Sequence, residues 1–269
     1  MQIIISPAKQ MLADTDTFAP AGIPPFPDKT ARIVEELQGI ERRQGARELQ
    51  NLWNVSDRLL DASLDMLHRF QPIIRESDLT EPDATARASA ALFTYRGLQY
   101  RHIAPTVLDR HALTWLNDHL WILSGLYGCV RPFHAVQPYR LEMGAKLAID
   151  GARNLYGYWG DKLAHAVTAR DRTVVNLASV EYAKAVLPHL DEDVTVVTCI
   201  FAESIRNGKP RQVSGASKAA RGTMVRWLAE QQADDAAVVE RFDIGYKVAV
   251  ELGHASADRR ERTVVFVKQ

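Results

Sequence analysis

The strongest local concentration of positive charge in the sequence lies between residues 206 and 226. These 21 residues carry six basic side chains and neither aspartate nor glutamate: Arg206, Lys209, Arg211, Lys218, Arg221 and Arg226. Clustered lysine and arginine side chains attract and bind phosphate groups. If the segment is helical, Lys218, Arg221 and Arg226 share an arc of roughly 140°. The pattern therefore predicts a phosphate-binding face, and the alternative is a solvated basic surface balanced by acidic groups elsewhere.

A glycine-rich motif provides a second candidate phosphate site. Ser124, Gly125 and Gly128 lie in the segment 123–128, LSGLYG, which follows a predicted amphipathic helix at 109–123. Two glycines three residues apart permit a tight turn, and the N–H groups at the start of a following helix bind anions. The motif therefore predicts a helix-hairpin-helix-like element that presents backbone N–H groups to phosphate. A glycine that caps the first helix and begins an ordinary turn is the alternative.

Polar side chains in conspicuous motifs form a third candidate site, a polar cleft. They are Tyr127, Arg140, Glu142, Asp161, Ser179, Glu181, Tyr182 and Lys184. Carboxylates together with basic groups supply an acid, a base and an anion clamp for work on a small molecule. Ser179 with a lysine base is also a chemically feasible nucleophile, but no oxyanion or histidine arrangement is evident beside it. Structural ion pairs that fix the loops are the alternative, for example between Glu181 and Lys184 on one helix.

Metal and cofactor sites have no support in the sequence. The eight histidines are scattered, and neither HExxH nor a paired Cys/His pattern accompanies them. The two cysteines, Cys129 and Cys199, are too few for a disulfide framework. The sequence contains neither a GxxxxGK[ST] phosphate loop nor a GxGxxG motif after a predicted strand. We therefore expect no metal site and no cofactor.

Strands and helices of an α/β (mixed α+β) protein are predicted to position these groups. Short apolar runs predict strands, and apolar residues at helical spacing predict helices. The expected strands are residues 2–5, 173–177 and 194–201, and the expected helices are 57–68, 109–123, 180–187 and 217–232, the last with Ser217 as its N-cap. Asn207-Gly208 predicts one hairpin, and 246–251 with 263–267 predicts another. We expect a mixed sheet with surrounding helices in a single compact domain, 1–269.

The overall composition is that of a globular protein. Hydrophobic residues make up 46% and charged residues 25%, which provides enough apolar material for a substantial core. The 33 basic residues balance 33 acidic ones, so only local charge can attract a polyanionic partner. No window approaches the length of a membrane span, and residues 1–9 lack a secretory signal pattern. We therefore expect a cytoplasmic protein that has no membrane partner.

Several motifs, taken in order, resemble those of the YaaA family of bacterial peroxide-stress proteins. They are residues 6–9 (SPAK), 95–100 (YRGLQY), 123–132 (LSGLYGCVRP), 137–144 (QPYRLEMG), 155–161 (LYGYWGD), 176–184 (NLASVEYAK), 218–226 (KAARGTMVR) and 245–246 (GY). The resemblance runs from the first strand to the C-terminal strand. It implies a cytosolic, single-domain α/β protein that limits damage by hydrogen peroxide and binds DNA in a positively charged cleft.

The resemblance also implies roles for individual residues. The basic residues expected to line the cleft and contact phosphates are Lys9, Arg140, Lys218, Arg221 and Arg226. The residues expected to form the hairpin that presents N–H groups are Ser124, Gly125 and Gly128.

Two functions remain open at the level of sequence. In the first, a monomeric protein grips DNA, distorted or single-stranded, through phosphate contacts and stacking on Tyr127, Tyr139 and Trp159. In the second, an enzyme acts on a nucleotide or a damaged base, and its polar cleft contains Arg140, Glu142, Asp161, Glu181 and Lys184. Direct iron sequestration fits a peroxide response, but the sequence offers no recognisable ligand cluster for it.

Overall fold

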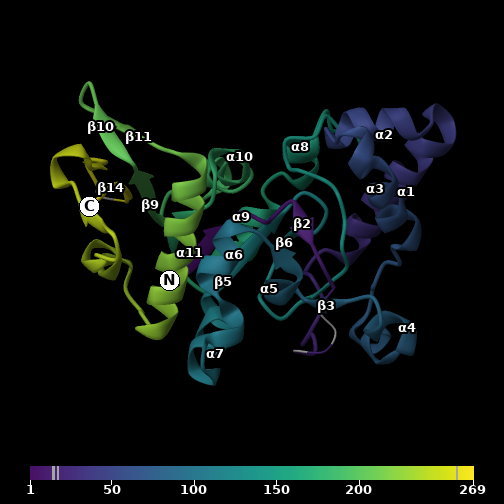
Figure 1. The fold of residues 1–269 in the computed structure, drawn as a ribbon, viewed down its shortest axis with the longest axis horizontal. Helices are drawn as coiled ribbons and strands as arrows, with labels where there is room; N and C mark the ends of the chain where they lie inside the picture. The colour runs from purple at the N-terminus through teal and green to yellow at the C-terminus, as the bar shows by residue number, and fades with distance from the viewer. Residues whose placement is uncertain (14–15, 17, 259) are drawn as a thin grey trace.

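A large mixed sheet forms the centre of the computed structural model, which describes residues 1–13, 16, 18–258 and 260–269. Its strands lie in the order β12-β14-β9-β8-β1-β5-β6, and β13 pairs with β14 (Figure 1). Their bounds are β1 Gln2–Ile5, β5 Leu120–Ser124, β6 Gly128–Val130, β8 Thr173–Leu177, β9 Thr195–Ala202, β12 Tyr246–Val248, β13 His254–Ala255 and β14 Glu261–Lys268. Strands β14, β9, β8, β1 and β5 run parallel, and β6, β12 and β13 pair antiparallel. The predicted α/β (mixed α+β) class is confirmed.

Helices and three small two-stranded sheets surround this centre. The helices are α1 Pro27–Gln44, α2 Ala46–Trp53, α3 Asp57–Arg69, α4 Pro82–Thr85, α5 Ala91–Thr94, α6 Leu98–Ile103, α7 Arg110–His119, α8 Leu155–Trp159, α9 Lys162–Thr168, α10 Val180–Ala183 and α11 Ser214–Glu230. The small sheets pair β2 Gln10–Met11 with β4 Tyr95–Arg96, β3 Ser89–Ala90 with β7 Ala135–Val136, and β10 Ser204–Arg206 with β11 Lys209–Arg211. Among the described residues, no helix combines the length and apolar character that a membrane crossing requires.

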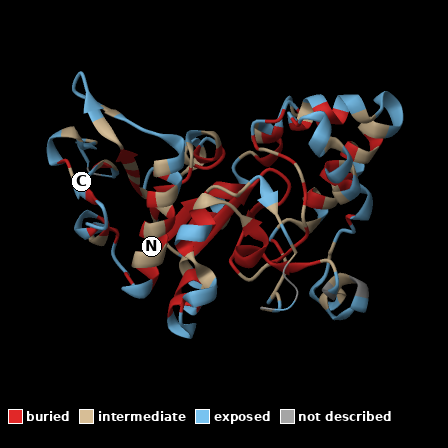
Figure 2. Ribbon diagram, viewed as in Figure 1, coloured by how far each residue is buried: buried red, intermediate tan, exposed pale blue. Residues whose placement is uncertain are grey.

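The central strands are covered on both faces. Every residue of β1 and β5 is buried (Figure 2), which is typical of a parallel sheet with helices on both sides. Helices α7 and α9 contact β1, and α11 contacts β9 and packs against α6. Residues of α1 and α2, such as Ile33 and Leu49, belong to the same hydrophobic core as Ile3–Ile5. The core is therefore continuous between the sheet and the helices inserted between β1 and β5.

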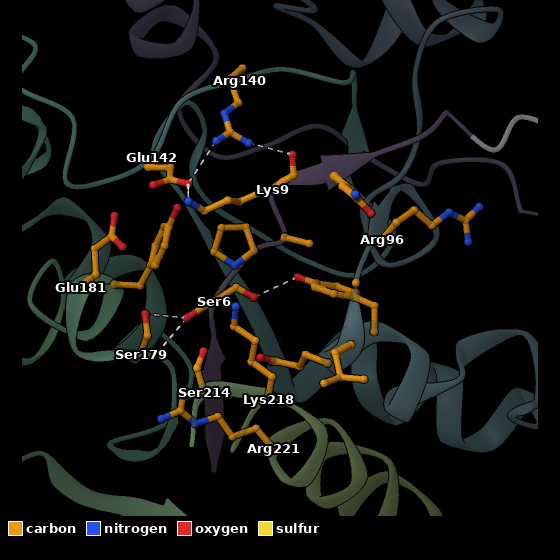
Figure 3. A pocket seen from close by; sticks show the side chains of 18 of the residues that line it. Ser6, Lys9, Arg96, Arg140, Glu142, Ser179, Glu181, Ser214, Lys218 and Arg221 are labelled. Carbon is orange, nitrogen blue, oxygen red and sulfur yellow. Dashed lines mark hydrogen bonds and ion pairs between the residues drawn. The ribbon is translucent and has the colours of Figure 1, made fainter. Parts of the chain in front are cut away.

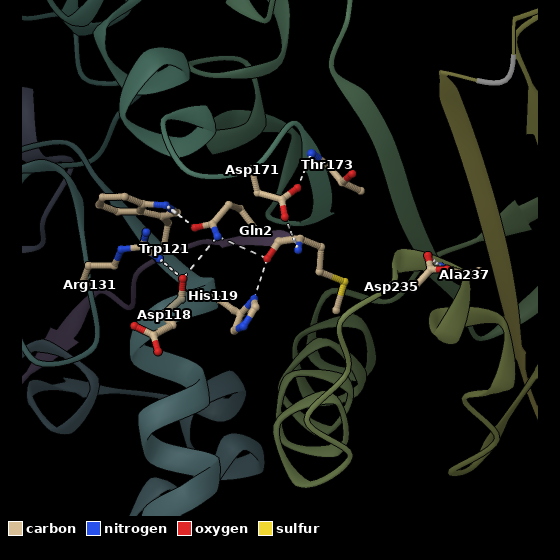
Figure 4. A network of polar contacts seen from close by, with 10 residues as sticks. Gln2, Asp118, His119, Trp121, Arg131, Asp171, Thr173, Asp235 and Ala237 are labelled. Carbon is tan, nitrogen blue, oxygen red and sulfur yellow. Dashed lines mark hydrogen bonds and ion pairs between the residues drawn. The ribbon is translucent and has the colours of Figure 1, made fainter.

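A polar network fixes the amino ends of β1 and β5 (Figure 4). Trp121 Nε1 donates a hydrogen bond to Gln2 Oε1 at 3.0 Å, and Gln2 Nε2 donates to the carbonyl oxygen of Asp118 at 3.2 Å. Arg131 Nη1 donates to the same carbonyl at 2.9 Å, and its guanidinium lies 3.8 Å from the centre of the Trp121 ring. The buried polar groups at this edge of the sheet thus find partners within the protein.

The segment predicted as one helix at 109–123 divides into a helix and a strand. Helix α7 ends at His119, and Leu120–Ser124 forms β5, hydrogen-bonded to β1 on one side and to β6 on the other. The helix prediction was wrong beyond His119. The leucine spacing was misleading because a strand buried on both faces is apolar throughout and has no period of two.

The LSGLYG segment is a β-hairpin, so the helix-hairpin-helix-like element predicted there is not formed. Ser124 ends β5, the turn follows, and Gly128 begins β6 with a φ of +74°. Ser124 Oγ accepts hydrogen bonds from the N–H groups of Leu126 and Tyr127, at 3.2 and 2.9 Å. The turn therefore uses these donors internally, and the whole segment is buried. It does not present N–H groups to phosphate.

The remaining elements follow the sequence predictions with shifted ends. Strands β1 and β8 and the hairpin turn at Asn207-Gly208 are confirmed. The final hairpin forms between β12 and β14. The helix expected at 180–187 is the short α10 followed by a 3₁₀ turn at Leu187–His189. Helix α11 begins at Ser214, and Ser217 is not its N-cap: its hydroxyl donates to the carbonyl oxygen of Phe201 at 3.1 Å.

The order of the parallel strands predicts a ligand-binding position at the carboxyl ends of two neighbouring strands. Numbered along the chain, the five strands β1, β5, β8, β9 and β14 lie in the order 2-1-3-4-5. The chain leaves β1 toward one side of the sheet and later returns to β8 on the other. In open α/β sheets, a crevice forms at such a switch point, outside the carboxyl ends of the two strands. Here that point lies between Ile5 and Leu177.

Candidate functional site

A cavity of about 450 Å³ lies at the carboxyl ends of β1 and β8. Five segments distant in sequence line it: residues 6–10, 96–100, 139–142, 179–182 and 214–221. Its polar lining includes Ser6, Lys9, Arg96, Arg140, Glu142, Ser179, Glu181, Ser214, Lys218 and Arg221 (Figure 3). The volume is within the range of small-molecule sites.

Two serines form the part of the cavity next to the sheet. The parallel pairing of β1 with β8 aligns Ile5 with Leu177, so the residues that follow each strand lie side by side. The N–H group of Ser179 donates to Ser6 Oγ at 2.8 Å, and Ser6 Oγ donates to Ser179 Oγ at 3.1 Å. Tyr100 donates from its hydroxyl to the Ser6 carbonyl oxygen at 3.1 Å. The Ser179 hydroxyl keeps its own proton for a ligand, because it acts as the acceptor in this pair.

The paired end of the cavity, which we define as Lys9, Arg140 and Glu142, contains two cations that share one carboxylate. Lys9 Nζ lies 2.7 Å and Arg140 Nη2 3.6 Å from Glu142 Oε1. Arg140 Nη1 also donates to the carbonyl oxygen of Lys9 at 3.3 Å. These contacts tie the loop after β1 to residues 139–142, and Lys9 and Arg140 share a single carboxylate there.

The cationic end of the cavity, which we define as Ser6, Ser179, Ser214, Lys218 and Arg221, has no carboxylate partner among the described residues. Helix α11 presents Ser214, Lys218 and Arg221 on one face, because they are separated by four and three positions. Lys218 points from the helix toward Ser6 (Figure 3). Burial lowers the pKa of Arg221, and its Nε is buried without a hydrogen-bond partner. A half-buried guanidinium without an anion is costly unless a ligand supplies one.

A buried hydroxyl network supports the loop that carries Arg140 and Glu142. Tyr139 shares hydrogen bonds with the hydroxyls of Ser124, at 2.7 Å, and Tyr95, at 3.1 Å. Burial raises the pKa of Tyr139 to about 12, so it remains a neutral donor at physiological pH. A Cβ atom at Gly125 would lie 2.8 Å from the carbonyl oxygen of Leu141. The LSGLYG hairpin thus acts on the cavity indirectly, by packing beneath residues 139–142.

The structure brings together eight of the residues predicted to form the site. They are Lys9, Arg140, Glu142, Ser179, Glu181, Tyr182, Lys218 and Arg221, and all of them line the cavity. Glu181 Oε1 also accepts a hydrogen bond from the Gly144 N–H group at 2.9 Å, which fixes the loop above it. The basic run and the polar motifs, treated as separate signals in the sequence, therefore belong to one site.

Seven predicted residues lie elsewhere. Ser124, Gly125, Tyr127 and Gly128 are buried in the β5–β6 hairpin and do not line the cavity. Arg226 pairs with Glu230 at 2.8 Å, Asp161 lies 3.9 Å from Lys162, and Lys184 is exposed after α10. Helical spacing placed Arg226 on the basic face of α11, but the cavity covers only the first two turns of that helix.

Sequence reasoning missed six polar side chains of the cavity: Ser6, Gln10, Arg96, Gln99, Tyr100 and Ser214. A signal for Ser6 was available, because it directly follows a buried strand. Two such strands running parallel bring the residues after them to one edge of the sheet. Arg96 extends away from the other basic side chains (Figure 3). Nothing in the sequence distinguishes Ser214 from Ser217, which is three residues away on the same helix.

Comparison with known proteins shows relatives that match along most or all of the chain. The profile of the family described as "Peroxide stress protein YaaA" matches residues 1–252. A UPF0246 protein of Lactiplantibacillus plantarum is 40% identical over 90% of this chain and 91% of its own length. UPF0246 proteins of Pediococcus pentosaceus and Desulfitobacterium hafniense are 38% and 36% identical, each over 100% of this chain and 98% of its own length. The chain therefore belongs to the YaaA family of peroxide stress proteins.

Proposed function

We propose that this protein binds DNA in the cytoplasm during the response to peroxide, and that its cationic cavity holds phosphate groups of the nucleic acid. The observation that carries the proposal is the convergence of Lys218 and Arg221 on one cavity without a carboxylate partner in the described part of the chain. The full lining contains five basic and two acidic side chains. Such a site favours an anionic ligand over a neutral or cationic one.

A basic arm extends this surface beyond the cavity. The β10–β11 hairpin carries Arg206, Lys209 and Arg211, and it leads directly into α11 (Figure 1). These three side chains are exposed, as the pale blue hairpin in Figure 2 indicates. Exposed lysine and arginine side chains contact phosphates without reading the base sequence. The arm therefore suits a ligand with several phosphates, such as a DNA strand.

A salt-dependent binding experiment tests this function. Fluorescence anisotropy would be measured with duplex, bubbled and single-stranded DNA at several salt concentrations. We expect affinity to fall steeply with salt, because phosphate binding releases counterions. Replacing both cavity cations, in Lys218→Met/Arg221→Met, is expected to weaken binding about tenfold or more and to flatten the salt slope. Binding that is independent of salt, or unchanged in this variant, would contradict the proposal.

An enzyme that acts on a nucleotide or a damaged base is a second candidate. It is favoured by the volume of the cavity, about 450 Å³, and by the two carboxylates, Glu142 and Glu181, in its lining. Asp161 and Lys184, which the sequence suggested for the same role, lie outside it. Incubation of the protein with nucleotides and with oligonucleotides that contain damaged bases, followed by mass spectrometry, would test this function. A product that disappears in Glu142→Gln, although this variant still binds nucleic acid, would support the enzyme.

A further inference from the structure

We propose that the cationic end of the cavity is a receptor for a phosphate monoester, the terminal phosphate of a nucleotide or of a nucleic-acid strand. This inference rests on the proposed function, since it assigns a ligand to the same cavity. The inferred ligand is more specific than DNA in general, because a monoester at a strand end differs in charge and shape from the phosphodiesters within a strand. Three properties of this end of the cavity favour a monoester: its charge, its free donors and its position.

The charge of the cationic end matches a dianion. Lys9 and Arg140 share the single carboxylate of Glu142, whereas Lys218 and Arg221 contact no carboxylate among the residues described. Two cations therefore remain for the ligand. A phosphate monoester carries a charge of about −1.5 to −2 at pH 7, and an internal phosphodiester carries only a single negative charge. The monoester thus compensates both side chains, and the diester leaves one of them unmatched.

The free donors at the cationic end are numerous enough for three terminal oxygens. The hydroxyl of Ser179 acts as acceptor toward Ser6 and keeps its proton, and the hydroxyl of Ser214 has no protein partner in the described chain. Lys218 supplies up to three N–H donors, and Arg221 Nε is buried without a partner. Charge-assisted bonds from such groups to phosphate oxygens are short and strong. A phosphodiester offers only two unsubstituted oxygens for the same donors.

The position of the cationic end also favours a terminal group. It lies against the carboxyl ends of β1 and β8, where Ser6 and Ser179 meet at the edge of the buried sheet. Ser214 and Lys218 on the other side are exposed to solvent, so a terminal phosphate can approach the two serines with one covalent continuation behind it. An internal phosphodiester needs space for two. The paired end, with Lys9, Arg140 and Glu142, then lies where a sugar or base would follow the phosphate.

The chemistry of the proposed ligand connects the cavity with the family. Oxidative cleavage of deoxyribose leaves phosphate monoesters at the ends of the broken strand. Hydrolysis of a nucleic acid yields nucleoside monophosphates with the same group. Both sources present a phosphate monoester joined to one nucleoside, and the cavity of about 450 Å³ is of the size class that binds small molecules. The experiment therefore separates the free nucleotide from the strand end.

Isothermal titration calorimetry with small ligands tests the monoester itself. Thymidine 5′-monophosphate and thymidine 3′-monophosphate would be compared with thymidine, for the wild type, Arg221→Met and Arg226→Met. We expect at least one monophosphate to bind at least about tenfold more tightly than thymidine, because of the charge-assisted bonds. Arg221→Met should lose this preference. Arg226→Met is the matched control, because Arg226 lies on the same helix, pairs with Glu230 and does not line the cavity.

Oligonucleotides with different ends distinguish the source of the ligand. One single-stranded sequence would carry a 5′-phosphate, a 3′-phosphate or hydroxyl groups at both ends. Tighter binding of a phosphorylated end supports both the inference and DNA binding. Binding of thymidine monophosphate without binding of any oligonucleotide supports the inference but contradicts the DNA function. A third outcome is that the three oligonucleotides bind with equal affinity, and that thymidine and its monophosphates also bind with equal affinity. This outcome overturns the inference and leaves DNA binding intact. An equal loss in Arg221→Met and Arg226→Met would also overturn it.

Discussion

Two desolvated arginines, the buried Arg131 and the half-buried Arg221, lie at opposite ends of the parallel strands and have different surroundings. At the amino ends of the strands, Arg131 donates to the Asp118 carbonyl and stacks on Trp121 (Figure 4). At the carboxyl ends of the strands, Arg221 lines the cavity with a buried Nε that has no hydrogen-bond partner (Figure 3). Burial lowers the pKa of both groups, that of Arg131 to about 10. Both guanidiniums are removed from water, but among the described residues only Arg131 has hydrogen-bond partners within the protein that offset the cost of desolvation.

This difference separates a structural cation from a binding one. A buried donor that finds its partners within the protein contributes to folding, whereas an unsatisfied one costs free energy in the absence of ligand. Arg131 belongs to the first kind, since backbone carbonyls and an aromatic ring take up its donors. Arg221 belongs to the second. A variant that shows Arg221 to be stabilising, or Arg131 to be dispensable, would contradict this assignment.

Loss of Arg131 should have the largest effect on stability. Arg131→Met leaves the carbonyl oxygens of Asp118 and Leu120 without this donor, and the expected loss is about 2–3 kcal/mol of unfolding free energy. Urea denaturation followed by circular dichroism measures it. Ligand affinity should not change in the fraction that remains folded. A stability equal to that of the wild type would mean that the network in Figure 4 is not structural.

Gly125→Ala tests whether the LSGLYG hairpin supports the cavity from beneath. The added Cβ atom would lie 2.8 Å from the carbonyl oxygen of Leu141, so the loop 139–142 must shift. We expect a loss of about 1–3 kcal/mol in stability, together with weaker DNA binding. Gly151→Ala is not a suitable control, because Gly151 has a φ of +80°. Ala219→Ser, a small change on α11 outside the cavity lining, serves better and should preserve affinity.

Arg221→Met should move stability in the opposite direction from Arg131→Met. Removing a desolvated cation that lacks a partner is expected to leave the unfolding free energy unchanged or to raise it by about 1 kcal/mol. DNA affinity should fall at the same time. The same urea titration gives the first quantity. A clear destabilisation would indicate that Arg221 has a structural role, and the contrast between the two arginines would then disappear.

Glu142→Gln sharpens the contrast between the two ends of the cavity. Removing this carboxylate frees the charges of Lys9 and Arg140 for a ligand. We expect DNA to bind roughly threefold more tightly at low salt, since these are partly exposed charges, and the gain should vanish at high salt. Anisotropy titrations at two salt concentrations measure both effects. Weaker binding in this variant would mean that the ion pairs are needed to shape the site.

Neither cysteine thiol should react with an alkylating reagent while the protein is folded. Burial raises the pKa of both Cys129 and Cys199 to about 12, so the reactive thiolate form is scarce at pH 7–9. Iodoacetamide should label neither thiol until the protein unfolds, and mass spectrometry can follow the labelling. Rapid modification of the native protein would instead indicate a peroxide-reactive thiol and a different link to oxidative stress.

The sequence predicted the strands and the cationic residues better than it predicted how they combine. Runs such as Ile3–Ile5 specify buried strands, and the acid-free segment 206–226 identified Lys218 and Arg221. The failures have physical causes. Leu120–Ser124 is apolar on both faces, so its spacing also fits a helix. The glycines of LSGLYG are required for packing that only the tertiary structure reveals. The pairing of Ser6 with Ser179 depends on strand order, which no local pattern encodes.

The central claim is that unmatched cations at the switch point of the sheet hold nucleic-acid phosphates. Its most direct test is an anisotropy titration of single-stranded DNA at several salt concentrations, with wild type, Arg221→Met and Arg226→Met measured side by side. We predict a steep salt slope for the wild type and for Arg226→Met, with a weaker affinity and a shallower slope for Arg221→Met alone. Absence of binding at low salt, or equal behaviour of all three proteins, would contradict the claim.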